Sequence, residues 1–241
     1  MGRSVYAPCR RTDPYFKLTD GNSLMKKSLL ESARYIAVEG PIGVGKTSLA
    51  RRLGEHLDAE LLLERPETNP FLSRFYQNQE RYALQTQLFF LFHRLDQLRD
   101  LAQPELFPRT VVSDYLLEKD PLFAGLTLNE DEYRLYRQIY DRVSQQASVP
   151  PDLVIYLQAS PEILVSRVRK RGIDMERKIS DDYLILLGES YTRFFHNYTD
   201  APVMVVNSEH LNFVDNDDDF QLLVQRIESM RGHREYFNRG D

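Results

Sequence analysis

Short apolar runs alternate with longer amphipathic stretches along most of this chain. The runs have the length and composition of buried strands, and they cover residues 35–39, 61–64, 109–114, 153–157 and 203–206. Between them, leucine, valine and tyrosine recur at three- and four-residue intervals, the spacing of one helix face. Continuous apolar strands separated by helices are typical of a parallel sheet covered on both faces. The pattern therefore predicts a single α/β domain whose last strand is 203–206.

Capping signals place several of the intervening helices. Asn129 followed by Glu132 has the form of a capping box, Ser160-Pro161 opens another helix, and Ser180 caps a third. Further helices are expected over 48–57 and 220–230.

The longest expected helix, residues 80–101, carries a leucine seam spaced four and three residues apart: Leu84, Leu88, Leu91, Leu95 and Leu98. A second apolar face follows Asn129 and centres on Tyr136. Heptad-like spacing suits either the core or a partner helix, and the sequence does not distinguish them.

Residues 1–33 differ from the rest of the chain. They mix arginine and proline without an apolar period, and Met25 is a plausible native start. We expect residues 1–33 to form a disordered extension and residues 34–241 to form the domain.

A glycine-rich motif follows the first strand. It reads Gly40, Pro41, Ile42, Gly43, Val44, Gly45, Lys46, Thr47 and, one residue later, Ser48. Strand, glycine turn and helix is the context that a phosphate-binding loop requires, because glycines let backbone N–H groups turn inward around phosphate oxygens. The helix N-terminus adds a favourable partial charge. A chance match in a glycine-containing turn is the alternative, and both flanks argue against it. The motif predicts binding of a nucleoside triphosphate.

Two side chains of this motif have predicted roles in the chemistry. Lys46 would reach the β- and γ-phosphates of ATP, and the Thr47 hydroxyl would ligate Mg²⁺.

Composition narrows the class of protein. The chain has 241 residues, 42% of them hydrophobic and 28% charged, which is ordinary for a globular protein. A net charge of −5 argues against a general nucleic-acid-binding surface, which needs a basic footprint. Cys9 is the only cysteine, so a thiolate metal site is excluded. No apolar run reaches the length of a membrane span. A cytoplasmic enzyme without membrane or nucleic-acid partners is expected.

Two acids end strands beside the expected loop. Glu64 and Asp114 follow apolar runs, and parallel strands present their C-terminal ends to the ligand crevice. Such an acid can take the proton of an attacking hydroxyl or hold Mg²⁺. An isolated strand-end acid more often caps a helix or meets solvent, but a phosphate loop in the same sheet reverses that preference. We predict Glu64 as the base and Asp114 as the Mg²⁺ ligand.

Arginines gather on the helix that Ser160-Pro161 opens. Arg167 and Arg171 are four residues apart and share a face. Paired guanidinium groups on a mobile segment neutralise the charge that grows on a transferring phosphoryl group. A solvated basic face is the plain alternative. Gly172 ends the helix and Glu176 follows it, which favours a lid.

Polar residues flank the leucine seam of the long helix. Gln87 and Arg94 are seven residues apart on the same side. Glutamine can pair with the N6/N7 edge of adenine, and arginine can donate to O6 or N7 acceptors. Without the other motifs, both residues would be interpreted as exposed polar residues of a helix.

From 34 to 231 the chain resembles the deoxynucleoside kinases, in particular the bacterial deoxyadenosine/deoxyguanosine kinase branch. The resemblance rests on the phosphate loop, on the strand-end acid, and on residues of the long helix and the lid. It implies a P-loop NTPase-type parallel sheet with a lid, Glu64 as catalytic base, and Tyr76 and Glu176 on the sugar. It implies Gln87 and Arg94 at the base, Arg167 and Arg171 on the phosphoryl group, and residues 207–219 around the donor's base.

Two departures from that family pattern stand out. Many members have Glu-Arg-Ser after the third strand, where this chain has Ser113-Asp114-Tyr115. The arginine beside the 5′-oxygen is absent, and Asp114 becomes a competing candidate for the base. A third lid arginine of some members is Ile173 here.

The resemblance implies transfer of the γ-phosphoryl group of ATP-Mg²⁺ to the 5′-hydroxyl of a deoxynucleoside, with a purine one preferred, by a homodimer. Two alternatives stay open at this point. A nucleoside monophosphate kinase of thymidylate kinase type would use Arg65 to grip the acceptor phosphate. A non-catalytic nucleotide-binding subunit with a kinase-like fold would need no intact Lys46.

Overall fold

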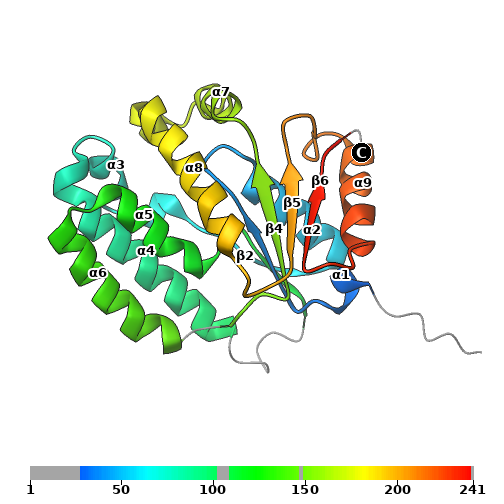
Figure 1. Cartoon of the computed structure of the whole chain (residues 1–241). Helices are drawn as coiled ribbons and strands as arrows, with labels where there is room; N and C mark the ends of the chain where they lie inside the picture. The colour runs from blue at the N-terminus through cyan, green and yellow to red at the C-terminus, as the bar shows by residue number, and fades with distance from the viewer. Residues whose placement is uncertain (1–27, 102–108, 147–148, 240–241) are drawn as a thin grey trace, which may run out of the picture.

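Parallel strands form the centre of the molecule (Figure 1). The computed structural model describes residues 28–101, 109–146 and 149–239. The sheet order is β2-β3-β1-β4-β5-β6, and all five strand pairs are parallel. The strands are β1 (Tyr35–Glu39), β2 (Glu60–Leu62), β3 (Val111–Ser113), β4 (Leu153–Gln158), β5 (Val203–Asn207) and β6 (Arg234–Phe237). Parallel neighbours need crossover connections, and helices supply them.

The helices cover the sheet in two layers (Figure 1). One layer holds α1 (Leu29–Ser32), α2 (Lys46–Leu57) and α9 (Asp217–Glu228). The other holds α4 (Gln79–Leu101), α5 (Asp120–Thr127), α6 (Glu130–Val143) and α8 (Asp181–Asn197). The remaining elements are η1 (Pro66–Thr68), α3 (Leu72–Phe75), η2 (Leu117–Lys119), η3 (Ser144–Gln146), α7 (Pro161–Arg171) and η4 (Asp174–Lys178).

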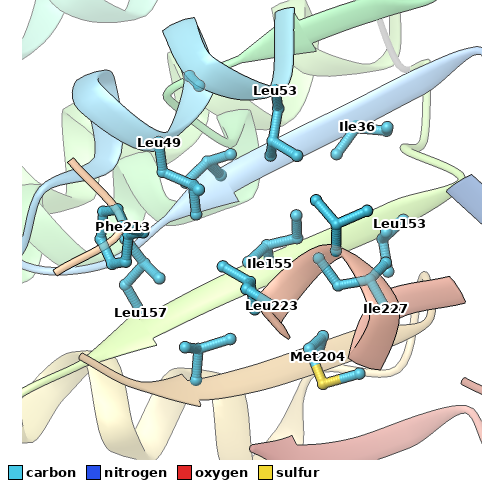
Figure 2. Close-up of a cluster of buried hydrophobic side chains, with 14 of the residues drawn as sticks. Ile36, Leu49, Leu53, Leu153, Ile155, Leu157, Met204, Phe213, Leu223 and Ile227 are labelled. Carbon is cyan, nitrogen blue, oxygen red and sulfur yellow. The ribbon is translucent and has the colours of Figure 1, made fainter. Parts of the chain in front are cut away.

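Alternation along the strands assigns side chains to the two layers. In β1, Ile36 and Val38 belong to the cluster under α2 and α9, whereas Tyr35 and Ala37 belong to the cluster on the opposite face. Figure 2 shows side chains of α2 and α9 meeting those of β1, β4 and β5 in the first cluster. Because both faces are buried, each central strand is apolar up to its last residue, and this made the strands recognisable in the sequence.

The predicted fold class is confirmed, and the prediction that residues 203–206 form the last strand is wrong. β6 pairs with β5 through Val203 and Arg234 and forms the edge of the sheet. Its sequence, Arg-Glu-Tyr-Phe, has no apolar run, and only Phe237 is buried. An edge strand that faces water lacks the signal by which the central strands were found.

Ser28 to Ala33 fold as part of the domain, whereas the sequence predicts them to belong to the disordered extension. Ser28 caps α1 through a capping box with Glu31, and Leu30 is buried in the core. Residues 1–27, to which the rest of that prediction applies, lie outside the described residues.

The leucine seam of α4 packs inside this chain. Leu91, Leu95 and Leu98 are buried in the cluster with α8, and Leu84 and Leu88 pack against the same cluster. Tyr136 of α6 is buried there as well. Leu91, Leu95, Leu98 and Tyr136 therefore belong to the core of this chain, whereas Leu84 and Leu88 are only partly buried.

No helix in the described ranges combines the length and the apolarity that crossing a membrane demands.

The first peptide of the phosphate loop requires glycine. Gly40 has φ +151°, and a Cβ there would lie 2.5 Å from the Leu157 carbonyl oxygen. Gly40→Ala is therefore expected to lower the free energy of unfolding by about 2–4 kcal/mol, from strain and overlap together. Urea unfolding followed by circular dichroism measures this. Gly125→Ala is the matched control, because its nearest neighbour would be Tyr133 at 3.7 Å and alanine favours helix α5. Equal losses of unfolding free energy in both variants would contradict the requirement for glycine at position 40.

Candidate functional site

The phosphate loop joins the end of β1 to the start of α2. Gly43 and Gly45 have φ of +87° and +105°, which side chains rarely adopt, and α2 begins directly at Lys46. The Lys46 ammonium folds back over the loop, where Nζ donates to the Gly40 carbonyl at 2.8 Å and to the Pro41 carbonyl at 3.2 Å. A cradle of amides with one ammonium beside it is suited to phosphate oxygens.

Asp114 connects the loop with the neighbouring strand end. Its Oδ2 accepts a hydrogen bond from the Thr47 hydroxyl, and its Oδ1 accepts from the Glu64 amide at 2.7 Å. Burial raises the pKa of Asp114, and these two hydrogen bonds offset only part of that rise.

The Thr47 and Asp114 oxygens are the hard donors that Mg²⁺ prefers. The described residues hold no cluster of three or more metal-ligating side chains. This fits a Mg²⁺ site completed by substrate phosphates and water, because that ion is usually held through one or two carboxylates.

Arg94 lies between two carboxylates. Its Nε donates to Glu64 Oε1 at 2.8 Å, Nη2 contacts the same oxygen, and Nη1 contacts Asp120 Oδ1. Burial alone would raise the pKa of Glu64, but the charges of Arg94 and Lys119 and the Arg94 hydrogen bond hold it at about 2. Glu64 is thus a fixed carboxylate at neutral pH.

A cavity extends from the phosphate loop past Glu64 to the helices of the second layer. At its loop end it is lined by Lys46, Thr47 and Glu64. Aromatic rings line the far part: Phe75, Tyr76, Phe90, Phe123 and Tyr183. A slot with a carboxylate at one end and aromatic walls at the other suits a hydroxyl attached to a planar ring system.

Gln87 gives the aromatic end of this cavity a polar wall. Its side chain is mostly buried, and Nε2 donates to the Thr127 hydroxyl at 3.2 Å. The neighbouring Thr86 Oγ1 is buried without a partner, and it is the one such side-chain atom lining this cavity in the described part of the chain. Arg94 also lines the cavity, but its guanidinium is engaged by the carboxylates, so its predicted contact with a base stays a prediction.

An ion pair joins the end of α7 to the segment predicted to form a lid. Arg171, in the last turn of α7, donates through Nη2 to Glu176 Oε1 at 2.6 Å. Both residues line the cavity, as does Tyr76. Arg169 has another role, because it donates to the Ile179 carbonyl at 2.6 Å and to Asp181 at 2.7 Å, tying α7 to α8.

A second cavity lies on the other side of the loop. It is lined by Gly45, Ser48 and Arg167, and by residues 211–215 of the loop predicted to enclose the donor's base. Arg167 is held there, with Nη2 donating to the Ser208 carbonyl at 2.7 Å. Gly43 and Arg171 line both cavities and mark where they meet.

Every predicted site residue therefore lies on the two cavities or contacts a residue that does. Sequence reasoning missed Asp120, Lys119, Thr86 and the two phenylalanines at 90 and 123. Asp120 follows a Lys119 that reads as ordinary surface charge, and nothing in the local pattern indicates burial. Their positions depend on how α4 and α5 pack.

Comparison with known proteins gives a consistent family. A family model described as deoxynucleoside kinase matches residues 36–230. The deoxyguanosine kinase of Bacillus subtilis is 33% identical over 206 residues, which cover 83% of this chain and 99% of that protein. The deoxyadenosine kinase of Lactobacillus acidophilus is 30% identical over 194 residues, covering 75% of this chain and 88% of that protein.

Solved structures agree with this similarity. The deoxyadenosine kinase from M. mycoides with bound dATP superposes with a TM-score of 0.70 at 27% identity, covering 81% of this chain and 100% of that one.

Proposed function

This chain belongs to the deoxynucleoside kinase family, and from that premise we propose that it phosphorylates the 5′-hydroxyl of a purine deoxynucleoside, with Glu64 as the base. It is an ATP-dependent phosphotransferase. The observation that carries the residue assignments is the meeting of the two cavities at Gly43 and Arg171, directly beside Lys46 and Glu64.

In the proposed reaction the deoxynucleoside occupies the cavity with the aromatic walls. Its 5′-hydroxyl lies at the loop end, and the Glu64 carboxylate takes its proton as the oxygen bonds to the γ-phosphorus. Arg94 holds Glu64 in place through two N–H groups. Tyr76 and Glu176 contact the sugar. Positioning supplies most of the acceleration, because a phosphoryl transfer leaves little covalent work to the protein.

ATP occupies the second cavity and the phosphate loop. The amides of residues 43–47 and the Lys46 ammonium hold the β- and γ-phosphates, and Arg167 lies beside the donor's base or phosphates. Arg171 reaches the transferring group from the boundary between the cavities once Glu176 releases it. Thr47 and Asp114 are the residues that would hold Mg²⁺, which would neutralise charge on the donor's phosphates.

Preference for a purine rests on Gln87 and on the relatives. Its amide lies at the aromatic end of the cavity, where a bidentate pair with the N6/N7 edge of adenine is chemically suited. The most similar relatives reported above are named for deoxyguanosine and deoxyadenosine. A more distant relative from Bacillus subtilis, 26% identical, is named deoxyadenosine/deoxycytidine kinase, so a pyrimidine is a meaningful comparison substrate.

A substrate panel tests this preference. We expect wild-type protein to phosphorylate deoxyadenosine and deoxyguanosine with a kcat/KM above that for deoxycytidine and thymidine. Gln87→Ala should lower kcat/KM for deoxyadenosine by about 10-fold or more, because it removes a bidentate pair worth about 1–3 kcal/mol. Steady-state assays with ATP-Mg²⁺ measure both. Equal losses on all four nucleosides would mean that Gln87 only supports packing.

The monophosphate-kinase alternative has little support. Arg65, the residue that would grip an acceptor phosphate, is exposed and is not among the residues lining the cavity. The same assay with the nucleoside monophosphates supplied separately decides. Turnover of monophosphates alone would favour that alternative, and no transfer at all would favour a non-catalytic subunit.

Homodimer formation and a cytoplasmic location remain predictions.

A further inference from the structure

A buried ion pair lies between the phosphate loop and the cavity with the aromatic walls, which we call the nucleoside cavity. The mechanism above does not use this pair. Lys119 Nζ is 3.1 Å from Glu39 Oε2, and the two side chains are 2% and 0% exposed. Removing a lysine and a carboxylate from water is costly unless the charges meet partners. The contacts of both side chains therefore decide whether the pair has a role besides stability.

Glu39 anchors the phosphate loop. Its Oε1 accepts a hydrogen bond from the Gly40 amide at 2.8 Å, which is the first amide of the loop, and another from the Tyr191 hydroxyl of α8 at 2.9 Å. Its Oε2 accepts from the Leu116 amide at 2.8 Å. One carboxylate thus joins β1, the loop, α8 and the turn after β3. Lys119 is fixed to this junction.

Lys119 has donors left for a ligand. An ammonium group carries three N–H donors, and within the described ranges Glu39 is the side chain that accepts from it. The Lys119 side chain nevertheless lines the nucleoside cavity together with Lys46 and Glu64. On its other side Nζ lies 5.7 Å from the centre of the Phe123 ring. The ammonium is therefore buried, fixed and adjacent to the loop end of the cavity.

Lys119 shares the wall of this cavity with groups of both reacting sides, since Lys46 and Glu64 line the same cavity. Two ammonium groups on one cavity are suited to an anion that forms there.

We propose that Lys119, held by Glu39, donates a hydrogen bond to the oxygen that links the 5′-carbon to the γ-phosphorus during transfer. This rests on the proposed function. The 5′-hydroxyl proton passes to Glu64, the new bond joins that oxygen to the γ-phosphorus, and the bond from the γ-phosphorus to the β-bridging oxygen breaks, its electron pair leaving with ADP. Lys119 keeps its proton throughout and stabilises charge at the acceptor end, as Lys46 does at the donor end.

A pair of variants separates this role from charge neutralisation of Glu39. Lys119→Met leaves the carboxylate buried and unpaired, so loss of stability is expected in that variant. Glu39→Gln/Lys119→Met removes both charges and keeps one oxygen for the Gly40 amide and the Tyr191 hydroxyl, so it should be more stable than Lys119→Met. In the double variant kcat for deoxyguanosine should nevertheless stay about 10²–10³-fold below wild type, with a KM for ATP within about 3-fold. Recovery of kcat together with stability would overturn the proposal.

A measurement on unaltered protein covers the case in which the double variant does not fold. Lysine labelled with ¹⁵N at Nζ should show a shifted Lys119 signal when ADP, Mg²⁺, aluminium fluoride and deoxyguanosine are added together. The signal should not shift in the same way with ADP and Mg²⁺ alone. An unchanged Lys119 signal in the full mixture would overturn the proposal. Wild-type turnover is measured first, because its absence would instead remove the proposed function.

Discussion

Glu64→Gln is expected to lower kcat for deoxynucleoside phosphorylation by about 10²–10⁴-fold, because an amide cannot take the 5′-hydroxyl proton. The glutamine keeps an oxygen that accepts from Arg94, and Arg94 retains its contact with Asp120, so the fold should persist. Steady-state kinetics with deoxyguanosine and saturating ATP-Mg²⁺ measures the loss, and circular dichroism verifies the fold.

Asp114→Asn is the matched comparison, because it replaces the other strand-end acid by its amide. Asp114 contacts Thr47 rather than Arg94, as a Mg²⁺ ligand would. Its activity should therefore recover partly at raised Mg²⁺, whereas that of Glu64→Gln should not. A loss in Asp114→Asn that Mg²⁺ does not relieve, with a milder loss in Glu64→Gln, would exchange the two roles.

The pH profile of wild type gives the same distinction without substitution. A carboxylate base works only when it is deprotonated. Burial raises the pKa of Glu64, but the charges of Arg94 and Lys119 lower it more and hold it at about 2. With Glu64 as the base, kcat/KM should not fall as the pH is lowered from about 8 to 5. Asp114 has a pKa that burial raises above the ordinary carboxyl value, so an acid limb moving toward neutrality would point to it instead.

Lys46→Ala is expected to lower kcat by on the order of 10³-fold, because the γ-phosphoryl group loses the ammonium that stabilises its charge. ATP affinity should fall as well, since the ground-state phosphates lose the same partner. Unfolding should remain cooperative, because the hydrogen bonds lost are only the two to the Gly40 and Pro41 carbonyls. Kinetics and titration calorimetry with ATP measure these effects.

Arg51→Ala serves as the control for that variant. Arg51 is an exposed cation on the same helix, and its removal should leave kcat within about 2-fold of wild type. Equal losses in both variants would show that α2 responds to any loss of positive charge, and would contradict a specific role for Lys46.

The local signals in the sequence predicted the frame of the site and its donor side. A phosphate loop needs closely spaced glycines of positive φ, so residues 40–47 were recognisable without tertiary information. Central strands are apolar on both faces and were found for that reason. β6 was not, because an exposed edge carries no such pattern.

The acceptor side depends on packing between elements far apart in the chain. Lys119 is separated from Glu39 by 80 residues, and no local pattern shows that it is buried against that carboxylate. Likewise, the position of Arg94 on α4 suggested a base contact, whereas the fold brings its guanidinium to Glu64 after β2 and to Asp120 of α5. The leucine seam left two interpretations open, and burial in this chain decided between them.

The central claim is that one loop holds the donor's phosphates while Glu64 meets the acceptor's hydroxyl. A crystal structure with a non-hydrolysable ATP analogue, Mg²⁺ and deoxyguanosine tests it most directly. We expect the β- and γ-phosphates on the amides of residues 43–47 with Lys46, and the 5′-oxygen within hydrogen-bonding distance of Glu64. A loop without phosphates, or a 5′-oxygen seated on Asp114 instead, would contradict the account.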